Sequence, residues 1–127
     1  MLLIDTDVMV DVLRRRDTAI DWLESLGSEE IGLPGLVAME LLQGCRNSIE
    51  QQRVQNFISR FPIYWPSDAD CERAFSDFAV HHLASSLGIL DSLIAETAIG
   101  RSAVLVTFND KHYSVITALQ IRRPYLK

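Results

Sequence analysis

The chain has 127 residues, 48% of them apolar and 23% charged, with a formal net charge of −5, so we expect one ordinary folded domain over residues 1–127. No apolar run approaches the roughly 20 residues that span a bilayer, and Asp5 interrupts the N-terminal run too early for a signal peptide, so we expect a cytoplasmic protein with no membrane association. The acidic balance argues against binding nucleic acid through a broad basic face, unless several acids share bound cations.

Short apolar segments alternate with helical patterns along the whole chain. The first half predicts a strand at 2–4, a helix ending near Leu13, a helix at 18–26, a strand at 30–33, a helix at 36–42, a helix capped by Ser48 and reaching Phe61, and a strand at 62–66. The second half predicts a long helix capped by Ser67 or Asp68 and ending near Gly88, a helix at 91–99, a strand at 103–107, a helix from Asp110 through Leu119, and a last strand near Ile121.

This alternation predicts a three-layer α/β/α sandwich around a mainly parallel sheet. Ligands of such sheets bind beyond the carboxyl ends of the strands, so polar residues that directly follow strands are the first candidates for a site. Asp5 follows the first predicted strand, and Thr107, Asn109 and Asp110 stand at the end of the fourth. We expect these side chains to face one cleft.

Two further acids lie in apolar helical segments. Glu40 stands between Met39 and Leu41, and Asp91 opens the helix that continues Leu-Ile-Ala. A buried acid without a partner is costly, and few basic residues lie nearby in the sequence. Hard divalent cations with oxygen ligands are the natural partners of converging carboxylates, and they can activate water against a phosphodiester. The pattern therefore predicts a metal-dependent nuclease.

Several of these polar residues also have ordinary structural interpretations. Asp7 is predicted to be the N-cap of the first helix, and Asp91 suits an N-cap or first-turn position favoured by the helix dipole. Asn109 and Asp110 by themselves are typical of a turn, and His112 is expected at a strand edge or on the surface. Arginines near helix ends or at seven-residue spacing suit either a solvated face or a phosphate track: Arg14, Arg15, Arg16, Arg46, Arg53 and Arg60.

Four segments resemble, in order and at fitting intervals, the motifs of the PIN-domain family. LLIDTDVMVDVL resembles the family's opening strand, which delivers an Asp followed by Thr, and VAMELLQG resembles the second motif, an acid in a helix before a Gly. LDSLIAETA resembles the third motif, in which Asp heads a helix. LVTFNDKHY resembles the fourth, a strand ending in Thr-x-Asn or Thr-x-Asp with a His or Asp and an aromatic residue downstream. The closing RRPYL is similar to the tails of VapC-like toxins.

The resemblance covers the whole chain and implies a ribonuclease dependent on Mg²⁺ or Mn²⁺ that acts as the toxin of a toxin–antitoxin pair. It also implies an RNA substrate, a cognate antitoxin protein and a homodimer. The implied site residues are Asp5 and Asp91 as metal ligands, Glu40 on the metal or its water, Asn109 in the fourth position, Thr6 and Thr107 as supporting groups, and Asp110 as the alternative to Asn109.

Two other functions fit parts of the sequence. The segment IDTDV matches the Asp-x-Asp-x-Val opening of haloacid-dehalogenase-type phosphatases, whose first Asp is a nucleophile. Those enzymes also need a downstream Lys followed by paired acids, and no acidic pair follows Lys111 or Lys127. A catalytically inactive PIN-like binding module is the second alternative, although such a module has little reason to keep Asp5, Glu40 and Asp91.

Overall fold

The computed structural model describes every residue from Met1 to Lys127. Its centre is a sheet of five strands in the order β3-β2-β1-β4-β5, and each neighbouring pair is parallel. The strands are β1 (Leu2–Ile4), β2 (Ile31–Pro34), β3 (Ile63–Tyr64), β4 (Val104–Val106) and β5 (Ile121–Arg122). The expected parallel sheet is thus confirmed.

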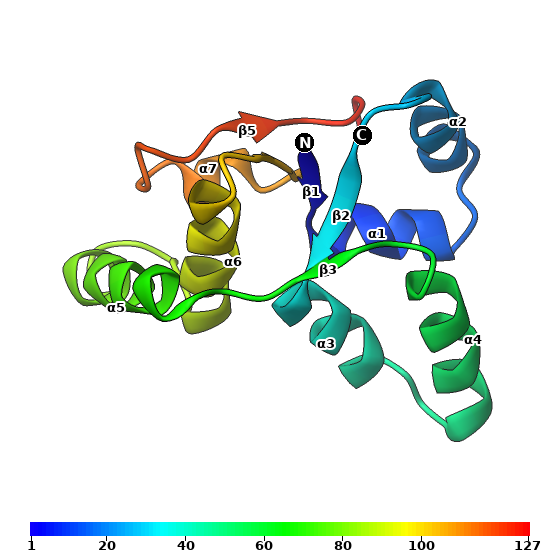
Figure 1. Cartoon of the computed structure of the whole chain (residues 1–127), viewed down its shortest axis with the longest axis horizontal. Helices are drawn as coiled ribbons and strands as arrows, with labels where there is room; N and C mark the ends of the chain where they lie inside the picture. Colours follow the sequence, from blue (N-terminus) through cyan, green and yellow to red (C-terminus); the bar gives the residue numbers. More distant parts are fainter.

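Seven helices cover this sheet. They are α1 (Thr6–Leu13), α2 (Asp17–Ser25), α3 (Gly35–Gln43), α4 (Ser48–Ile58), α5 (Asp68–His81), α6 (Ile89–Gly100) and α7 (Asp110–Tyr113). Figure 1 shows α5, α6 and α7 on one side of β1 and β2, with α1, α2 and α4 on the other. The three-layer α/β/α arrangement is therefore confirmed. No helix combines the length and the apolar character needed to cross a membrane.

The order of the strands reverses beside β1. From β1 the chain moves outward to β2 and β3, then crosses back to place β4 and β5 on the opposite side of β1. Leu2 is in register with Val104 and Ile4 with Val106, so the carboxyl ends of β1 and β4 lie side by side. Sheets of this kind bind ligands at such a reversal.

The core explains why such short strands form. Leu3, Ile4, Leu105 and Val106 have no exposed surface, because helices pack on both faces of the sheet. Strands buried on both faces are continuous apolar runs, as the sequence shows at both places. Burial of the whole run leaves the first polar residue after it, Asp5, at the edge of the core.

Two predicted helix caps were wrong by one or two residues. Asp5, not Asp7, is the N-cap of α1, and its side chain accepts a hydrogen bond from the Thr6 amide. Asn47, not Ser48, caps α4 by accepting from the Glu50 amide. Asp, Asn and Ser all cap helices well, so residue type alone does not select between neighbours. Ser67 caps α5 as predicted and forms a capping box with Asp70.

Three predicted helices are shorter in the structure. Helix α4 ends at Ile58 instead of reaching Phe61. Helix α5 ends at His81, where the Ser85 hydroxyl and amide both donate to the His81 carbonyl and turn the chain. Helix α7 stops at Tyr113 instead of continuing through Leu119. The segment after it contains consecutive β-branched residues, which disfavour helix, and it forms tight turns instead.

Candidate active site

The carboxyl ends of β1 and β4 bring Asp5 and Thr107 together, although 102 residues separate them in sequence. The Asp5 amide donates to the Val106 carbonyl at 2.9 Å, which extends the strand pairing by one residue. The Thr107 hydroxyl then donates to Asp5 Oδ2 at 2.8 Å, and the Thr6 amide donates to Asp5 Oδ1 at 2.8 Å. Both oxygens of Asp5 are therefore oriented by the fold.

Asp5 is only 4% exposed, and no basic side chain pairs with it. Burial, followed by the nearby charge of Asp7, raises its pKa to about 6. Hydrogen bonds from Thr6, Thr107 and Tyr113 act in the opposite direction but do not compensate. The pKa of Asp5 is raised because no positive charge offsets its burial, and a bound cation would supply that charge.

Glu40 joins the site through Thr6. The Thr6 hydroxyl at the start of α1 donates to Glu40 Oε1 on α3 at 2.8 Å. Thr6 thereby bridges Asp5 and Glu40, one through its amide and the other through its hydroxyl. The second carboxylate oxygen of Glu40, Oε2, accepts no hydrogen bond from the protein and is free to bind a ligand.

Asp91 enters from the first turn of α6. Its Oδ2 accepts from the Gly88 amide at 2.8 Å and lies 2.7 Å from His112 Nε2. The side chain of Tyr113 is buried near both acids: burial first, and then the charges of Asp5 and Asp91, raise the pKa of its hydroxyl. The phenol therefore stays protonated and can donate a hydrogen bond to Asp5.

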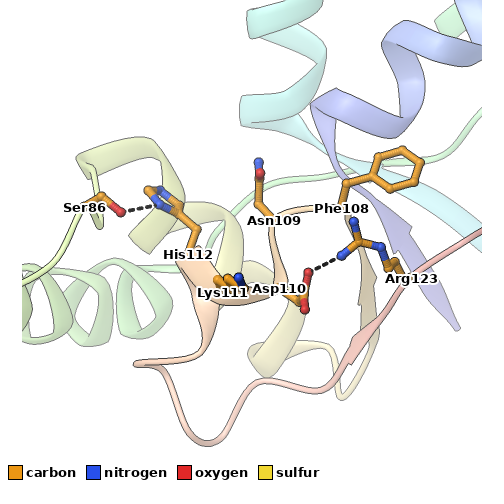
Figure 2. A pocket seen from close by; sticks show the side chains of 7 residues that line it. All are labelled: Ser86, Phe108, Asn109, Asp110, Lys111, His112 and Arg123. Atoms are coloured by element: carbon orange, nitrogen blue, oxygen red, sulfur yellow. Dashed lines mark hydrogen bonds and ion pairs between the residues drawn. The ribbon is translucent and has the colours of Figure 1, made fainter. Parts of the chain in front are cut away.

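The two polar residues of the fourth motif, Asn109 and Asp110, have different surroundings. Asp110 is exposed and forms an ion pair with Arg123, whereas the Asn109 side chain points away from that pair (Figure 2). The Asn109 amide donates to the Thr107 hydroxyl at 3.0 Å, which fixes the backbone there. The structure therefore places Asn109 next to Thr107 but gives its side chain no partner, and Asp110 is held away by Arg123.

Asp7 holds the end of β4 in place. Its Oδ2 accepts from the Phe108 amide at 3.0 Å and from the Thr107 hydroxyl at 3.4 Å, while Oδ1 accepts from the Val8 amide. Burial raises the pKa of Asp7 despite these bonds. Asp7 is thus not the predicted N-cap of α1, and its carboxylate instead joins the start of α1 to the backbone that follows β4.

The donor set suits a hard divalent cation. Asp5 and Glu40 have no ion-pair partner, and the only one of Asp91 is an imidazole. Carboxylate oxygens are the ligands that Mg²⁺ and Mn²⁺ prefer. No three acidic, imidazole or thiol groups are placed close enough together to hold a metal ion, so ligation requires side chains to move. The charge and chemistry of the site fit a cation, and its side chains are not yet closed around one.

The PIN-domain family model matches residues 2–117, a span that includes all of these acids. The chain belongs to the PIN-domain family. Ribonuclease VapC19 of Mycobacterium tuberculosis is 38% identical over 125 residues, which cover 94% of this chain and 98% of that protein.

Solved structures share this PIN fold over nearly their full length. The toxin–antitoxin complex from Klebsiella pneumoniae superposes with a TM-score of 0.81 at 24% identity and covers 100% of both chains. VapBC2 from Rickettsia felis, bound to a DNA fragment from its promoter, gives 0.80 at 25% identity, over 96% of this chain and 97% of the other.

Three residues of this PIN site were missed or undervalued in the sequence. His112 was expected at a strand edge or on the surface, but it contacts Asp91 and is about one quarter exposed. Ser86 and Tyr113 were not singled out. The aromatic residue after the fourth motif was a signal for Tyr113, whereas nothing in the sequence pairs Ser86 with His112, 26 residues away.

Proposed function

We propose that this PIN-domain protein is the toxin of a toxin–antitoxin pair and that it hydrolyses RNA with the aid of Mg²⁺ or Mn²⁺. The observation that carries the proposal is the pair of acids without ion-pair partners that Thr6 bridges at the β1/β4 reversal, Asp5 and Glu40. Its support is the 38% identity to a VapC ribonuclease over nearly the full length of both chains. We take residues 1–127 as one such domain, acting in the cytoplasm where its RNA and antitoxin are made.

In this proposal Asp5 and Asp91 hold the cation, and Glu40 reaches it directly or through a water. The bound cation supplies a Lewis acid that polarises the scissile phosphate and activates a water. Thr107 and Thr6 keep the carboxylates of Asp5 and Glu40 oriented toward it through their hydroxyl hydrogen bonds. Asn109 presents a neutral amide, a weaker ligand than a carboxylate, so we propose that any second ion arrives with the RNA phosphate.

A groove beside the site suits the antitoxin. It is lined by residues of α1, α2, α3 and α4, and Thr6 and Glu40 are among them. Apolar side chains such as Leu23 and Phe57 line it. Four arginines that form no ion pair also border it: Arg14, Arg15, Arg53 and Arg60. We define this as the arginine groove and propose that an amphipathic, acidic segment of the antitoxin binds there and covers Glu40.

An exposed apolar surface suits the expected homodimer. The Trp65 ring packs on Gly35 of α3, and Met39 lies one turn further along the same helix. Trp65 is 54% exposed and Met39 56%. We propose that a second copy covers this surface. Light scattering should give a dimer for the wild-type protein and a monomer for Met39→Glu, and a wild-type monomer would contradict this part of the proposal.

The test of the main proposal combines growth and cleavage. Wild-type protein expressed alone should arrest growth, and the purified protein should cleave total RNA with Mn²⁺ or Mg²⁺ but not after chelation. Asp91→Asn should lose both effects, whereas Glu29→Gln, which removes an exposed charge far from the site, should keep both. If wild-type and Asp91→Asn proteins prove equally harmless to the native host, the toxin assignment is wrong, and an inactive binding module becomes the better description.

A further inference from the structure

Three side chains from three segments form a continuous hydrogen-bonded chain that ends on Asp91. Ser86 Oγ lies 2.7 Å from His112 Nδ1, and His112 Nε2 lies 2.7 Å from Asp91 Oδ2. Figure 2 shows the Ser86 hydroxyl directed at the imidazole across the edge of the cleft that Asn109 and Lys111 also line. Ser86 comes from the loop before α6, Asp91 from the first turn of α6, and His112 from α7.

The chain of contacts has one consistent set of donors for a neutral imidazole. Ser86 donates to Nδ1, and the protonated Nε2 donates to the carboxylate of Asp91. The Gly88 amide donates to the same oxygen, Oδ2, at 2.8 Å. Two donors thus occupy Oδ2, and Oδ1 of Asp91 is left without a protein partner.

The Gly88 contact leaves little freedom for Asp91. A Cβ atom at position 88 would lie 3.0 Å from Asp91 Oδ2, which is tighter than ordinary packing. The backbone of Gly88 is extended, a conformation open to any residue, so the close approach of the carboxylate is what favours glycine here. The Asp91 carboxylate is therefore held by two groups, the Gly88 amide before α6 and the His112 imidazole on α7.

The Ser86–His112–Asp91 arrangement resembles the order of groups in a serine nucleophile site, but it lacks the rest of one. An acyl-transfer site needs free amides that stabilise an oxyanion near the nucleophile. The two amides that follow Ser86 are already used, since Leu87 donates to Ser85 Oγ and Gly88 donates to Asp91. The contacts therefore orient Asp91 and do not activate Ser86.

We propose that His112, itself held by Ser86, is a positioning residue that fixes Asp91 by its Oδ2 and directs Oδ1 to the catalytic cation. This inference rests on the proposed metal-dependent function, and it adds two residues to the site. Groups that hold a metal-bound side chain typically change metal affinity by about 10- to 100-fold when they are removed. His112 does not itself bind the cation, because its Nε2 proton is used on Asp91.

The test measures binding of Mn²⁺ alone to the full-length protein by calorimetry and by electron spin-echo spectroscopy, without RNA. His112→Leu should weaken Mn²⁺ binding by about tenfold or more, and Ser86→Ala by a smaller factor. His112→Gln keeps a donor near the Nε2 position and should restore most of the affinity. His82→Leu is the matched control, because His82 stacks on Phe78 and contacts no acid, so it should bind as the wild type does.

Two results would overturn the inference. Unchanged Mn²⁺ affinity in folded His112→Leu would show that Asp91 needs no positioning. A directly coordinated nitrogen in the wild-type Mn²⁺ spectrum, lost in His112→Gln, would show that His112 is a ligand instead. Because these readouts need no RNA, a protein that binds Mn²⁺ as described but never cleaves RNA would refute the proposed function and leave the positioning role standing.

Discussion

At the scale of single residues, the site contains a carboxylate that is buried without a positively charged partner. Asp5 is buried to 4% exposure beside Asp7, and its pKa is raised to about 6. Keeping such a group ionised at neutral pH costs roughly 3 kcal/mol relative to an exposed aspartate. Functional sites often carry costs of this kind, which a bound ligand removes.

Asp5→Asn should therefore remove RNA cleavage and, in the absence of metal, stabilise the fold by on the order of 1–2 kcal/mol at pH 7.5. The folded-state pKa of Asp5 lies above its unfolded value of 3.8, so the wild type has its full stability below about pH 4 and loses part of it as the pH rises through 6. The advantage of Asp5→Asn should thus vanish near pH 4.

Thermal melts in chelator at both pH values check this prediction, with Asp17→Asn on the surface as the control. Added Mn²⁺ should raise the melting temperature of the wild type more than that of Asp5→Asn. A metal-free Asp5→Asn protein that is less stable than the wild type at pH 7.5 would show that the buried charge is compensated in a way the structure does not contain.

The fourth motif gives a second prediction at this scale. Asp110 is half exposed and paired with Arg123, and exposed ion pairs of this kind contribute only about 0–1 kcal/mol. Because the Asp110 side chain bonds Arg123 and no other group of the site, Asp110→Asn should cost much less activity than Asp5→Asn or Asp91→Asn. Asn109→Asp should tighten binding of a second Mn²⁺, because it replaces an amide by a carboxylate.

Calorimetric Mn²⁺ titrations and cleavage rates of these variants decide the point. Should Asp110→Asn prove as inactive as Asp5→Asn while remaining folded, Asp110 would be the fourth acid of the site and Asn109 a structural residue.

At the scale of secondary structure elements, the packing of α5 on α6 fixes the helix that carries Asp91. A Cβ atom at Gly100 of α6 would collide with the Asp70 carboxylate of α5, so the two helices approach closely there. Arg73 bonds Asp70 and also Glu96, at 2.7 Å for the latter. Asp77 is the fourth member of this group, and its Oδ2 is buried without a hydrogen-bond partner.

Burial and the adjacent carboxylate of Glu96 raise the pKa of Asp77 to about 7. A protonated Asp77 can donate to Glu96, whereas an ionised one repels it. Because the folded-state pKa lies above the unfolded 3.8, the α5–α6 contact is most stable at low pH and weakens as the pH rises through 7. Asp77→Asn keeps a donor at every pH, so it should stabilise the protein at pH 8 and have little effect at pH 4.

Urea denaturation at the two pH values measures this difference. The exposed Asp68→Asn on the same helix is the control for a change in net charge. A destabilised Asp77→Asn protein at pH 8 would mean that the ionised carboxylate is preferred, through Arg73.

At the scale of the whole molecule, the distribution of charge matters more than its sum. The net charge of −5 by itself gives no indication of a basic surface on this protein that could bind a partner. The structure nevertheless gathers Arg14 and Arg15 of the α1 end with Arg53 and Arg60 of α4 along one groove, and none of them forms an ion pair. Arg60 additionally stacks over Phe57 at 5.4 Å. A local positive field can form on an acidic protein where unpaired arginines gather.

The double variant Arg53→Glu/Arg60→Glu should weaken binding of the cognate antitoxin by about tenfold or more at low salt, and the difference should shrink at high salt. RNA cleavage by the free toxin should be largely retained, since neither arginine contacts the acids. Arg122→Glu on β5 is the matched control. If the double variant binds antitoxin normally but loses RNA cleavage, the arginine groove belongs to the RNA path.

Much of this architecture could be predicted from local sequence. The apolar runs at 2–4 and 103–107 and the alternation of strands with helices predicted the parallel sandwich, and the acids after those strands predicted where a site would lie. The errors fall where local preferences compete. Asp5 and Asp7 are both of a residue type that caps helices well. In the fold, the Phe108 amide, about 100 residues away, donates to Asp7, and Asp5 is the N-cap.

The sequence by itself determined the fold class, the parallel strands and the identity of the acids, because hydrophobic periodicity and residue type act over short distances along the chain. Only the tertiary structure decided which polar groups meet. Thr6 bridges Asp5 to Glu40, Ser86 and His112 hold Asp91, and Arg123 withdraws Asp110. These contacts join residues 13 to 34 positions apart in the chain, where loop conformation and helix packing, not local pattern, set the distances.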